Sequence, residues 1–278
     1  MVAADRPTFV RRSSIYRGPH CRYNDGTLIV RFVVIDSSPP LLYLASVNSS
    51  CPNIGRWMQV ACIVAFSVVS DSAQAQAPGV SSAFTIARVK YAGGGDWYND
   101  PSAEVNLLRF AQSLTGMETN PRYTFVEIGS ENFFSYPMVF LTGHGNIVLS
   151  DPEVRRLRIY LQNGGFLYAD DDYGMDKSFR REMKKVFPGY ELVELAFSHP
   201  LYHSPFQFPG GPPKTHEHDN KQPRGLGFIY EGRLVVYYTV ESNPSDGWAD
   251  PDVHNDPAPK REEALRFGTN IVVYAMTH

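Results

Sequence analysis

Short runs of nearly continuous apolar residues alternate with helical stripes between residues 84 and 198. Such runs, bounded by glycine or proline, are typical of strands that are buried on both faces. Apolar residues three or four positions apart are typical of helices that cover a sheet. We therefore expect β-strands at residues 84–91, 123–128, 137–142, 166–169 and 191–197.

Helix start and stop signals lie between these strands. Asp100-Pro101 places a capping residue and a proline in a first turn, and Gly116 ends the helix that they begin. Similar signals begin helices at Ser150 and at Asp176. Strands and helices that alternate in this way predict a mostly parallel sheet with helices on both faces.

The pattern changes after residue 198. Residues 199–224 are rich in Pro, Gly and His, and a loop of this length inside a compact domain is usually functional or mobile. Residues 226–230 and 233–240 flank a Glu-Gly pair and predict a hairpin. A second polar loop is expected at residues 241–259 and a last helix at residues 260–276.

The first 77 residues differ in composition from the rest of the chain. They contain seven Arg but no Lys and no Glu, and they hold all three cysteines, Cys21, Cys51 and Cys62. Residues 60–69 form an apolar run that follows Arg56 and precedes two small-x-small sequences, which is typical of a signal peptide. The run is too short for a membrane span, so no stable transmembrane anchor is expected.

Three segments follow from this reading. We expect residues 1–57 to be an unstructured upstream extension, residues 58–77 to be the signal peptide and residues 78–278 to be the folded domain. A small folded addition is the alternative for the first segment, because residues 27–35 alternate enough to form a strand. The domain would be exported to the periplasm or the extracellular space, where a fold without cysteine depends on its core. A formal net charge of −3 with 43% hydrophobic residues gives no indication of nucleic-acid binding.

The expected sheet brings three loops together at the carboxyl ends of its strands, where ligands bind such sheets. These are residues 93–100, 143–145 and 170–174. A fourth loop, which contains Asp246, Trp248 and His254, combines acids and aromatics as sugar-binding loops commonly do. The residues that we expect to contact a ligand are Gly94, Asp96, Trp97, Gly143, Gly145, Asp170, Asp172, Tyr173 and Trp248.

His144 and Asp171 are the candidate catalytic residues. Flanking glycines should expose His144 for ligand contact or acid–base chemistry, and Asp171 stands among three consecutive carboxylates. Crowded carboxylates favour a divalent cation or a shared proton, although they also cap turns or remain solvated. No cofactor is certain, and a divalent cation would be held by Asp170, Asp172, His216 and His218.

Three motifs carry a resemblance to a known family. They are residues 91–98 (YAGGGDWY), 141–145 (LTGHG) and 164–171 (GGFLYADD). With them the chain resembles the bacterial domain-of-unknown-function family 4159 over residues 84–278. The resemblance implies a flavodoxin-like α/β fold similar to class I glutamine amidotransferases and ThuA-like proteins. In that fold a nucleophilic cysteine follows the strand equivalent to residues 166–169, but no cysteine follows Cys62 here.

Two functions remain open, and the sequence does not decide whether the protein is an enzyme. The first is a binding or scaffold module that recognises a small polar ligand, such as a carbohydrate or a peptide. The second is a metal-dependent hydrolase in which Asp170–Asp172, His144 and a loop histidine surround a cation that activates water.

Overall fold

The computed structural model describes residues 21–24, 27–30, 83–216 and 218–278. The chain divides into two compact units, Met1–Gln76 and Ala77–His278. In the first unit, strand β1 (Cys21–Asn24) pairs antiparallel with β2 (Thr27–Val30). The proposed signal peptide lies outside the described residues, as does most of the proposed extension, so both stay predictions.

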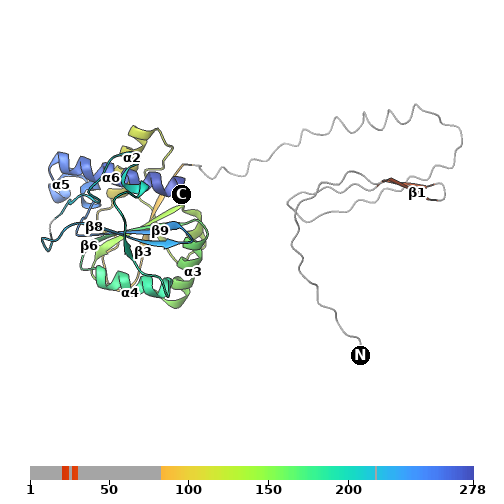
Figure 1. Ribbon diagram of the computed structural model, residues 1–278, viewed down its shortest axis with the longest axis horizontal. Coiled ribbons are helices and arrows are strands. Elements are labelled where there is room, and N and C mark those ends of the chain that lie inside the picture. Colours follow the sequence, from red (N-terminus) through yellow and green to blue (C-terminus); the bar gives the residue numbers. More distant parts are fainter. Residues whose placement is uncertain (1–20, 25–26, 31–82, 217) are drawn as a thin grey trace. The chain divides into compact units, whose positions relative to one another are not determined.

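The second unit is a mixed α/β domain built on a seven-stranded sheet (Figure 1). The strand order is β4-β3-β5-β6-β9-β8-β7, and β8 alone runs against the other strands of this sheet. The strands are β3 (Ile86–Lys90), β4 (Phe125–Glu127), β5 (Met138–His144), β6 (Phe166–Tyr173), β7 (Val193–Glu194), β8 (Arg224–Tyr230) and β9 (Arg233–Val240). The expected mostly parallel sheet and its hairpin are confirmed.

Helices cover both faces of the sheet. Figure 1 shows α2 and α6 on one side and α3 and α4 on the other. The α-helices are α2 (Ala103–Thr115), α3 (Asp151–Gln162), α4 (Asp176–Val186), α5 (Pro251–His254) and α6 (Ala258–Thr277). Three short 3-10 helices, η1 (Glu131–Ser135), η2 (Pro200–Tyr202) and η3 (Asp246–Trp248), lie in the connections.

Local sequence signals explain most helix ends. Ser150 and Glu153 form a reciprocal capping box at the start of α3, and Gly116 ends α2 in the left-handed conformation. The start of α2 differs from the expectation, because Ser102 and not Asp100 holds the N-cap position. Asp100 instead takes a left-handed backbone with φ of 44° and directs its carboxylate to His254.

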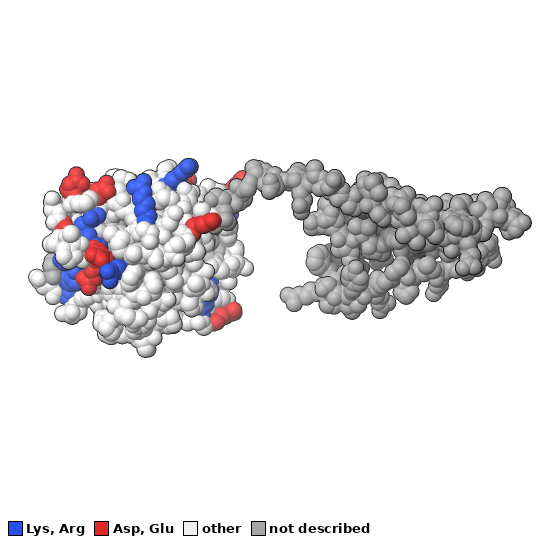
Figure 2. Space-filling view, turned by 90° about the horizontal axis from the view of Figure 1, so that it is seen from above, with Lys and Arg blue, Asp and Glu red and all other residues white. Residues whose placement is uncertain are grey.

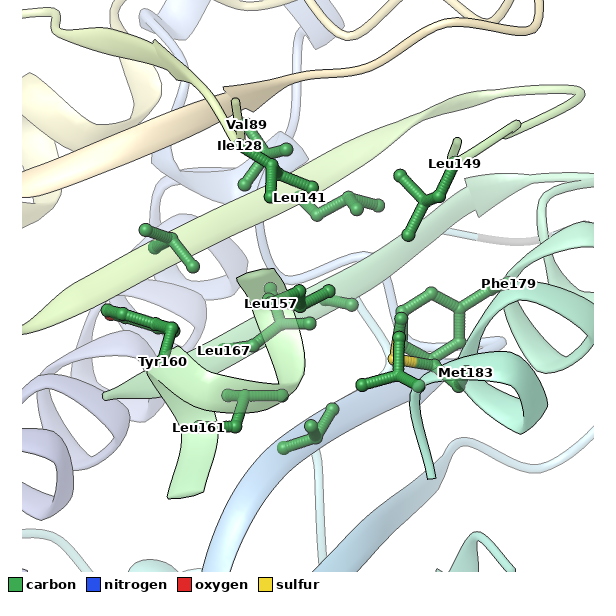
Figure 3. Packing of buried hydrophobic residues seen from close by; sticks show 14 of the residues in the cluster. Val89, Ile128, Leu141, Leu149, Leu157, Tyr160, Leu161, Leu167, Phe179 and Met183 are labelled. Atoms are coloured by element: carbon green, nitrogen blue, oxygen red, sulfur yellow. The ribbon is translucent and has the colours of Figure 1, made fainter. Parts of the chain in front are cut away.

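Two apolar layers enclose the sheet. Beneath α3 and α4, Leu141 and Leu167 pack with Leu157 and Phe179 (Figure 3). On the other face the buried residues include Phe140, Tyr168, Trp248 and Phe267. Burial on both faces explains why β5 and β6 have nearly continuous apolar sequences.

Two segments differ from the sequence-based expectation. Strand β6 does not end at Ala169 but continues through three aspartates to Tyr173. Residues 241–249, expected as a polar loop, are buried throughout. Both differences have the same cause, because polar groups of this loop form hydrogen bonds with the β6 carboxyl groups of Asp170 and Asp172.

The surface carries charges of both signs. On the face that Figure 2 shows, acidic and basic side chains lie beside one another. Arg266 and Glu262 of α6 form one exposed ion pair. Within the part of the chain that the structure describes, no helix is both long and apolar enough to cross a membrane.

Candidate functional site at the carboxyl ends of the strands

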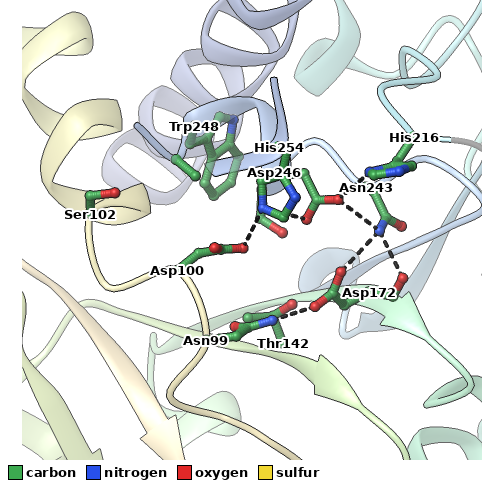
Figure 4. Close-up of polar contacts among 12 residues, drawn as sticks. Asn99, Asp100, Ser102, Thr142, Asp172, His216, Asn243, Asp246, Trp248 and His254 are labelled. Carbon is green, nitrogen blue, oxygen red and sulfur yellow. Dashed lines mark hydrogen bonds and ion pairs between the residues drawn. The ribbon is translucent and has the colours of Figure 1, made fainter. Parts of the chain in front are cut away.

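Polar side chains gather where β3, β5, β6 and β9 end. The loops after these strands bring together residues that are far apart in the sequence, and Figure 4 shows many of them. We call this group the strand-end cluster. It consists of Asp96, Asn99, Asp100, His144, Asp172, His216, Asn243, Asp246 and His254.

His144 is the most exposed member of the ion pairs in this cluster. Its Nδ1 lies 3.1 Å from Asp96 Oδ2 and 3.2 Å from Asp172 Oδ2, while its side chain is 53% exposed. The backbone amide of His144 also donates to Asp96 Oδ1. Two carboxylates thus hold one ring nitrogen and leave the rest of the ring accessible, as in acid–base sites built on histidine.

The glycines around His144 allow close approach of the backbone. Gly143 has φ of 137°, and a Cβ there would lie 2.5 Å from the Tyr91 hydroxyl oxygen. Gly145 has φ of 87° but open space around it. Gly95 donates its backbone N–H to Asn146 O at 3.1 Å. The glycine-rich loop is therefore fixed against the end of β5, and Gly94 is its exposed, open position.

Asp170 is a fully buried, fully partnered carboxyl group. Thr239 Oγ1 donates to its Oδ1 at 2.5 Å, and the backbone and hydroxyl of Ser245 donate to Oδ2 at 3.0 and 2.6 Å. Burial raises the pKa of Asp170 to about 7, against the opposing effect of these hydrogen bonds. Its oxygens serve the fold and are not directed to a ligand.

Asp172 lies between two amides. Asn99 Nδ2 donates to its Oδ2, and Asn243 Nδ2 donates to its Oδ1 at 3.1 Å and to its backbone oxygen at 2.8 Å. Burial, and then the negative charges of Asp246 and Asp170, raise the pKa of Asp172 to about 9. A proton on Asp172 reduces the repulsion between its carboxyl group and those of Asp246 and Asp170.

Asp171 is not brought to His144 by any contact in the described residues. Its Oδ1 accepts from the backbone N–H of Met175 at 2.8 Å, at the start of α4. Tyr173, two residues further along β6, is half exposed, and its ring stacks on His218 with ring centroids 4.7 Å apart. The three consecutive acids therefore have different partners. Asp170 binds the loop after β9, Asp171 binds the start of α4 and Asp172 belongs to the strand-end cluster.

The two tryptophans expected at the site differ in position. Trp97 is partly buried and packs edge-on against Tyr98 and tilted against Phe125. Trp248 is only 1% exposed, and its Nε1 donates to Ala264 O at 2.8 Å. Trp248 therefore belongs to the core and has no free face for a ligand.

His216, Asp246 and His254 form a compact group beside Asp172 (Figure 4). Nδ1 of His216 lies 2.7 Å from Asp246 Oδ2, and Nε2 of His254 lies 3.9 Å from Asp246 Oδ1. Nε2 of His254 is also 2.9 Å from Asp100 Oδ2. One donor atom from each of the three residues lies within 4.8 Å of the others.

This group differs from the metal site that the sequence predicted. His216 is shared, but His218 only stacks beside it, with ring centroids 5.4 Å apart. The oxygens of Asp170 and Asp172 are engaged by hydroxyl and amide donors. The acidic and aromatic residues around Trp248 indicated a candidate ligand-binding loop. No local sequence pattern indicated that Asp246 would contact His216.

A buried ion pair positions the loop that carries Asn99 and Asp100. Arg88 of β3 contacts Glu104 of α2 through two hydrogen bonds of 2.6 and 2.7 Å. The same guanidinium donates to the backbone oxygens of Trp97 and Asp100 at 3.3 Å. One buried side chain thereby fixes the path of the chain between β3 and α2.

The sequence matches the family described as Domain of unknown function (DUF4159) over residues 85–276, which covers the whole cluster. The chain belongs to this family. A search of curated proteins found no match.

Proposed function

We propose that this member of the DUF4159 family is an exported binding module that recognises a small, uncharged, hydroxyl-rich ligand at the strand-end cluster, and that its fold is similar to that of class I glutamine amidotransferases. The observation that carries the proposal is the accessible ring of His144, held by Asp96 and Asp172 at the end of β5.

The strand order supports the fold relationship. Numbered in chain order, the seven strands of the sheet stand in the order 2-1-3-4-7-6-5, so the first four, β4, β3, β5 and β6, follow the 2-1-3-4 order of flavodoxin-like sheets, and β9 continues them in parallel. Ligands of such sheets bind where the chain changes direction across the sheet, which is between the ends of β3 and β5. Asp96 follows β3 and His144 ends β5, so the two sides of this switch point meet at the His144 ring.

Charge and exposed rings indicate the ligand class. Asp96, Asp100, Asp172 and Asp246 lie around the cluster, so an anionic ligand would meet several carboxyl groups. Carboxylates and amides are good partners for hydroxyl groups. Tyr173, which follows Asp172 in β6, has a half-exposed ring that stacks on His218, and its exposed part is an aromatic surface for a sugar ring. We therefore favour a carbohydrate over a peptide.

The missing nucleophile supports binding over amidotransferase chemistry. At the end of β6, where the proposed fold similarity would place the cysteine of class I glutamine amidotransferases, this chain has Asp170, Asp171 and Asp172. The carboxyl groups of Asp170 and Asp172 form hydrogen bonds that hold the loop after β9. The glutamine-hydrolysing reaction of the similar fold is accordingly not proposed.

Calorimetric titration of the full chain tests the proposal. Cellobiose and chitobiose serve as uncharged probes, glucose 6-phosphate and glucuronate as anionic comparators, and an uncharged capped dipeptide as the peptide probe. We expect saturable binding of an uncharged disaccharide that His144→Ala weakens at least about tenfold. His203→Ala is the matched control, because its ring contacts Gln207 and Phe197. Tighter binding of the anionic probes or of the dipeptide would overturn the proposal. Equal disaccharide affinity of His144→Ala and His203→Ala would also overturn it.

A second candidate function, hydrolysis, is favoured by one observation. The Asp96–His144 pair has the arrangement of a general base oriented by a carboxylate. If the protein hydrolyses a glycosidic or ester bond, 4-nitrophenyl glycosides or 4-nitrophenyl acetate will release nitrophenol in a reaction that His144→Ala abolishes. Binding without turnover would support the module and exclude this candidate for those bonds.

A further inference from the structure

The group formed by His216, Asp246 and His254 combines three separate parts of the chain. His216 lies in the long loop after η2, Asp246 begins η3, and His254 ends α5. Figure 4 shows the three side chains turned toward one another. Their donor atoms lie within 4.8 Å of one another, although 30 residues separate His216 from Asp246.

Hydrogen bonding explains only part of this arrangement. Nδ1 of His216 forms a hydrogen bond with Asp246 Oδ2, and Nε2 of His254 forms one with Asp100 Oδ2. Asp246 itself is only 3% exposed, and its Oδ1 is a buried atom with no hydrogen-bond partner among the described residues. A buried carboxylate oxygen without a partner is costly, so something is needed to satisfy it.

The donor set matches the preferences of a transition-metal ion. Two imidazole nitrogens and one carboxylate oxygen are the ligands of many catalytic zinc sites, which keep a fourth position open. Tetrahedral zinc ligands lie about 3.4 Å apart when each is about 2.1 Å from the ion. His216 Nδ1 is 2.7 Å from Asp246 Oδ2 and His254 Nε2 is 3.9 Å from Asp246 Oδ1, and ligand atoms of the three residues all lie within 4.8 Å of one another. Side-chain rotations would bring them to one ion.

The surroundings have the features of a supporting shell. Asn243 Nδ2 lies 3.4 Å from Asp246 Oδ2 and also donates to Asp172, which fixes the carboxylate. Asp100 Oδ2 is near the nitrogen that His254 would use, where it could accept a proton from bound water. The carboxylates of Asp100 and Asp246 lie on the two sides of His254 in a poorly solvated region, and a divalent cation would balance their charge.

We propose that His216 Nδ1, His254 Nε2 and the Asp246 carboxylate bind a divalent transition-metal ion of the zinc type. The site goes beyond the proposed function, because ligand recognition by His144 does not require it. It connects to His144 through Asn243 and Asp172, so an ion there would stiffen the buried loop at residues 241–249.

Metal analysis of the full chain tests the site. The protein is purified without chelator, dialysed against metal-free buffer, and titrated with Zn²⁺ in a calorimeter; Co²⁺ is used as a spectroscopic probe. We expect one tightly held ion per chain and the visible absorption of Co²⁺ with nitrogen and oxygen ligands. His216→Gln and His254→Gln should each weaken Zn²⁺ binding at least about tenfold and reduce the Co²⁺ absorption.

His203→Gln is the matched control, because this histidine lies in the same long loop and its ring contacts Gln207 and Phe197. It should bind Zn²⁺ as the unchanged protein does. His216 is 41% exposed in its side chain, so His216→Gln should fold, which circular dichroism checks. Absence of stoichiometric Zn²⁺ binding in the unchanged protein, or equal loss in His203→Gln, would overturn the proposal. Either result leaves the carbohydrate titration of His144 unaffected.

Discussion

Arg88 and Glu104 form a two-point ion pair in which both side chains are almost completely buried. The pair joins β3 to α2, and the remaining guanidinium hydrogens hold the backbone of the loop that carries Asn99 and Asp100. The Arg88 side chain thus contributes both to the packing of β3 against α2 and to the position of the loop at the candidate site. Replacing Arg88 should lower the stability of the domain and disturb this loop.

Arg88→Met should lower the free energy of unfolding by about 3–5 kcal/mol, because it leaves the Glu104 carboxylate buried and unpaired. Arg266→Met is the matched control. It breaks the exposed Arg266–Glu262 pair of α6, where side chains are about half exposed, and should cost less than about 1 kcal/mol. Urea unfolding of both variants measures the difference, and similar small losses would show that the buried pair is not important for stability.

Loss of the proton from the buried Asp170 carboxyl group should lower the free energy of unfolding as the pH rises. Its folded-state pKa of about 7 exceeds the ordinary value of 3.8, so the folded chain binds the proton more tightly than the unfolded chain. The associated stability is complete below about pH 4, is lost as the pH rises to 7, and is on the order of 4 kcal/mol.

Asp170→Asn should therefore show a smaller decline in unfolding free energy between pH 4 and pH 7 than the unchanged protein. The Asp170 charge is one cause of the raised pKa of Asp172, but that pKa of about 9 lies above this pH range, so Asp172 contributes a similar decline to both proteins. Chelator in both series removes any contribution from bound metal. Parallel pH profiles for the two proteins would contradict this assignment.

Gly143→Ala should destabilise the domain more than Gly116→Ala. Both glycines have a positive φ, which costs an L-residue about 1–2 kcal/mol. The added methyl at Gly143 would also meet the Tyr91 hydroxyl oxygen at 2.5 Å, whereas nothing lies within 4 Å at Gly116. We expect an additional loss of about 1–3 kcal/mol, seen as a lower Tm. Equal Tm values would mean that the loop adjusts freely.

Asn243 should be replaceable by Gly at lower cost than by Ala. Either change removes the amide that donates to Asp172, at about 1–3 kcal/mol. Ala must also adopt the φ of 46°, which should add about 1 kcal/mol. Chemical unfolding of the two variants measures this difference. A more stable Ala variant would show that the backbone relaxes to another conformation.

The export prediction has a direct test at the chain start. Cleavage after Ala75 would leave Gln76 as the first residue of the native, purified protein. N-terminal sequencing or intact mass measurement decides this. A native protein that retains residues 1–57 would contradict both the signal peptide and the proposed extension.

The order of elements could be predicted because each depends on local sequence. Apolar runs indicated β5 and β6, and Ser150 with the following proline and acid indicated the start of α3. The continuation of β6 to Tyr173 could not be predicted in the same way. Consecutive aspartates suggest a turn, but Asp170 pairs with β5 and β9, and Thr239 and Ser245 supply donors to its carboxyl group from distant positions.

The candidate site was predictable only in part. His144 and Asp172 follow from their places at strand ends, and the structure brings them within 3.2 Å of each other. The meeting of His216 with Asp246 and His254 depends on how two long loops pack, for which periodicity gives no signal. The polar composition of residues 241–249 suggested exposure, yet these residues are buried, because Ser242, Asn243 and Ser245 form hydrogen bonds inside the domain.

The central claim is that the ligand binds at the His144 ring. Histidine side-chain NMR of the full chain during titration with an uncharged disaccharide tests it most directly, with the His144 signal assigned through His144→Asn. We predict that the His144 ring signals shift saturably while those of His203 stay in place. Saturable binding that leaves the His144 signals unmoved would contradict the account.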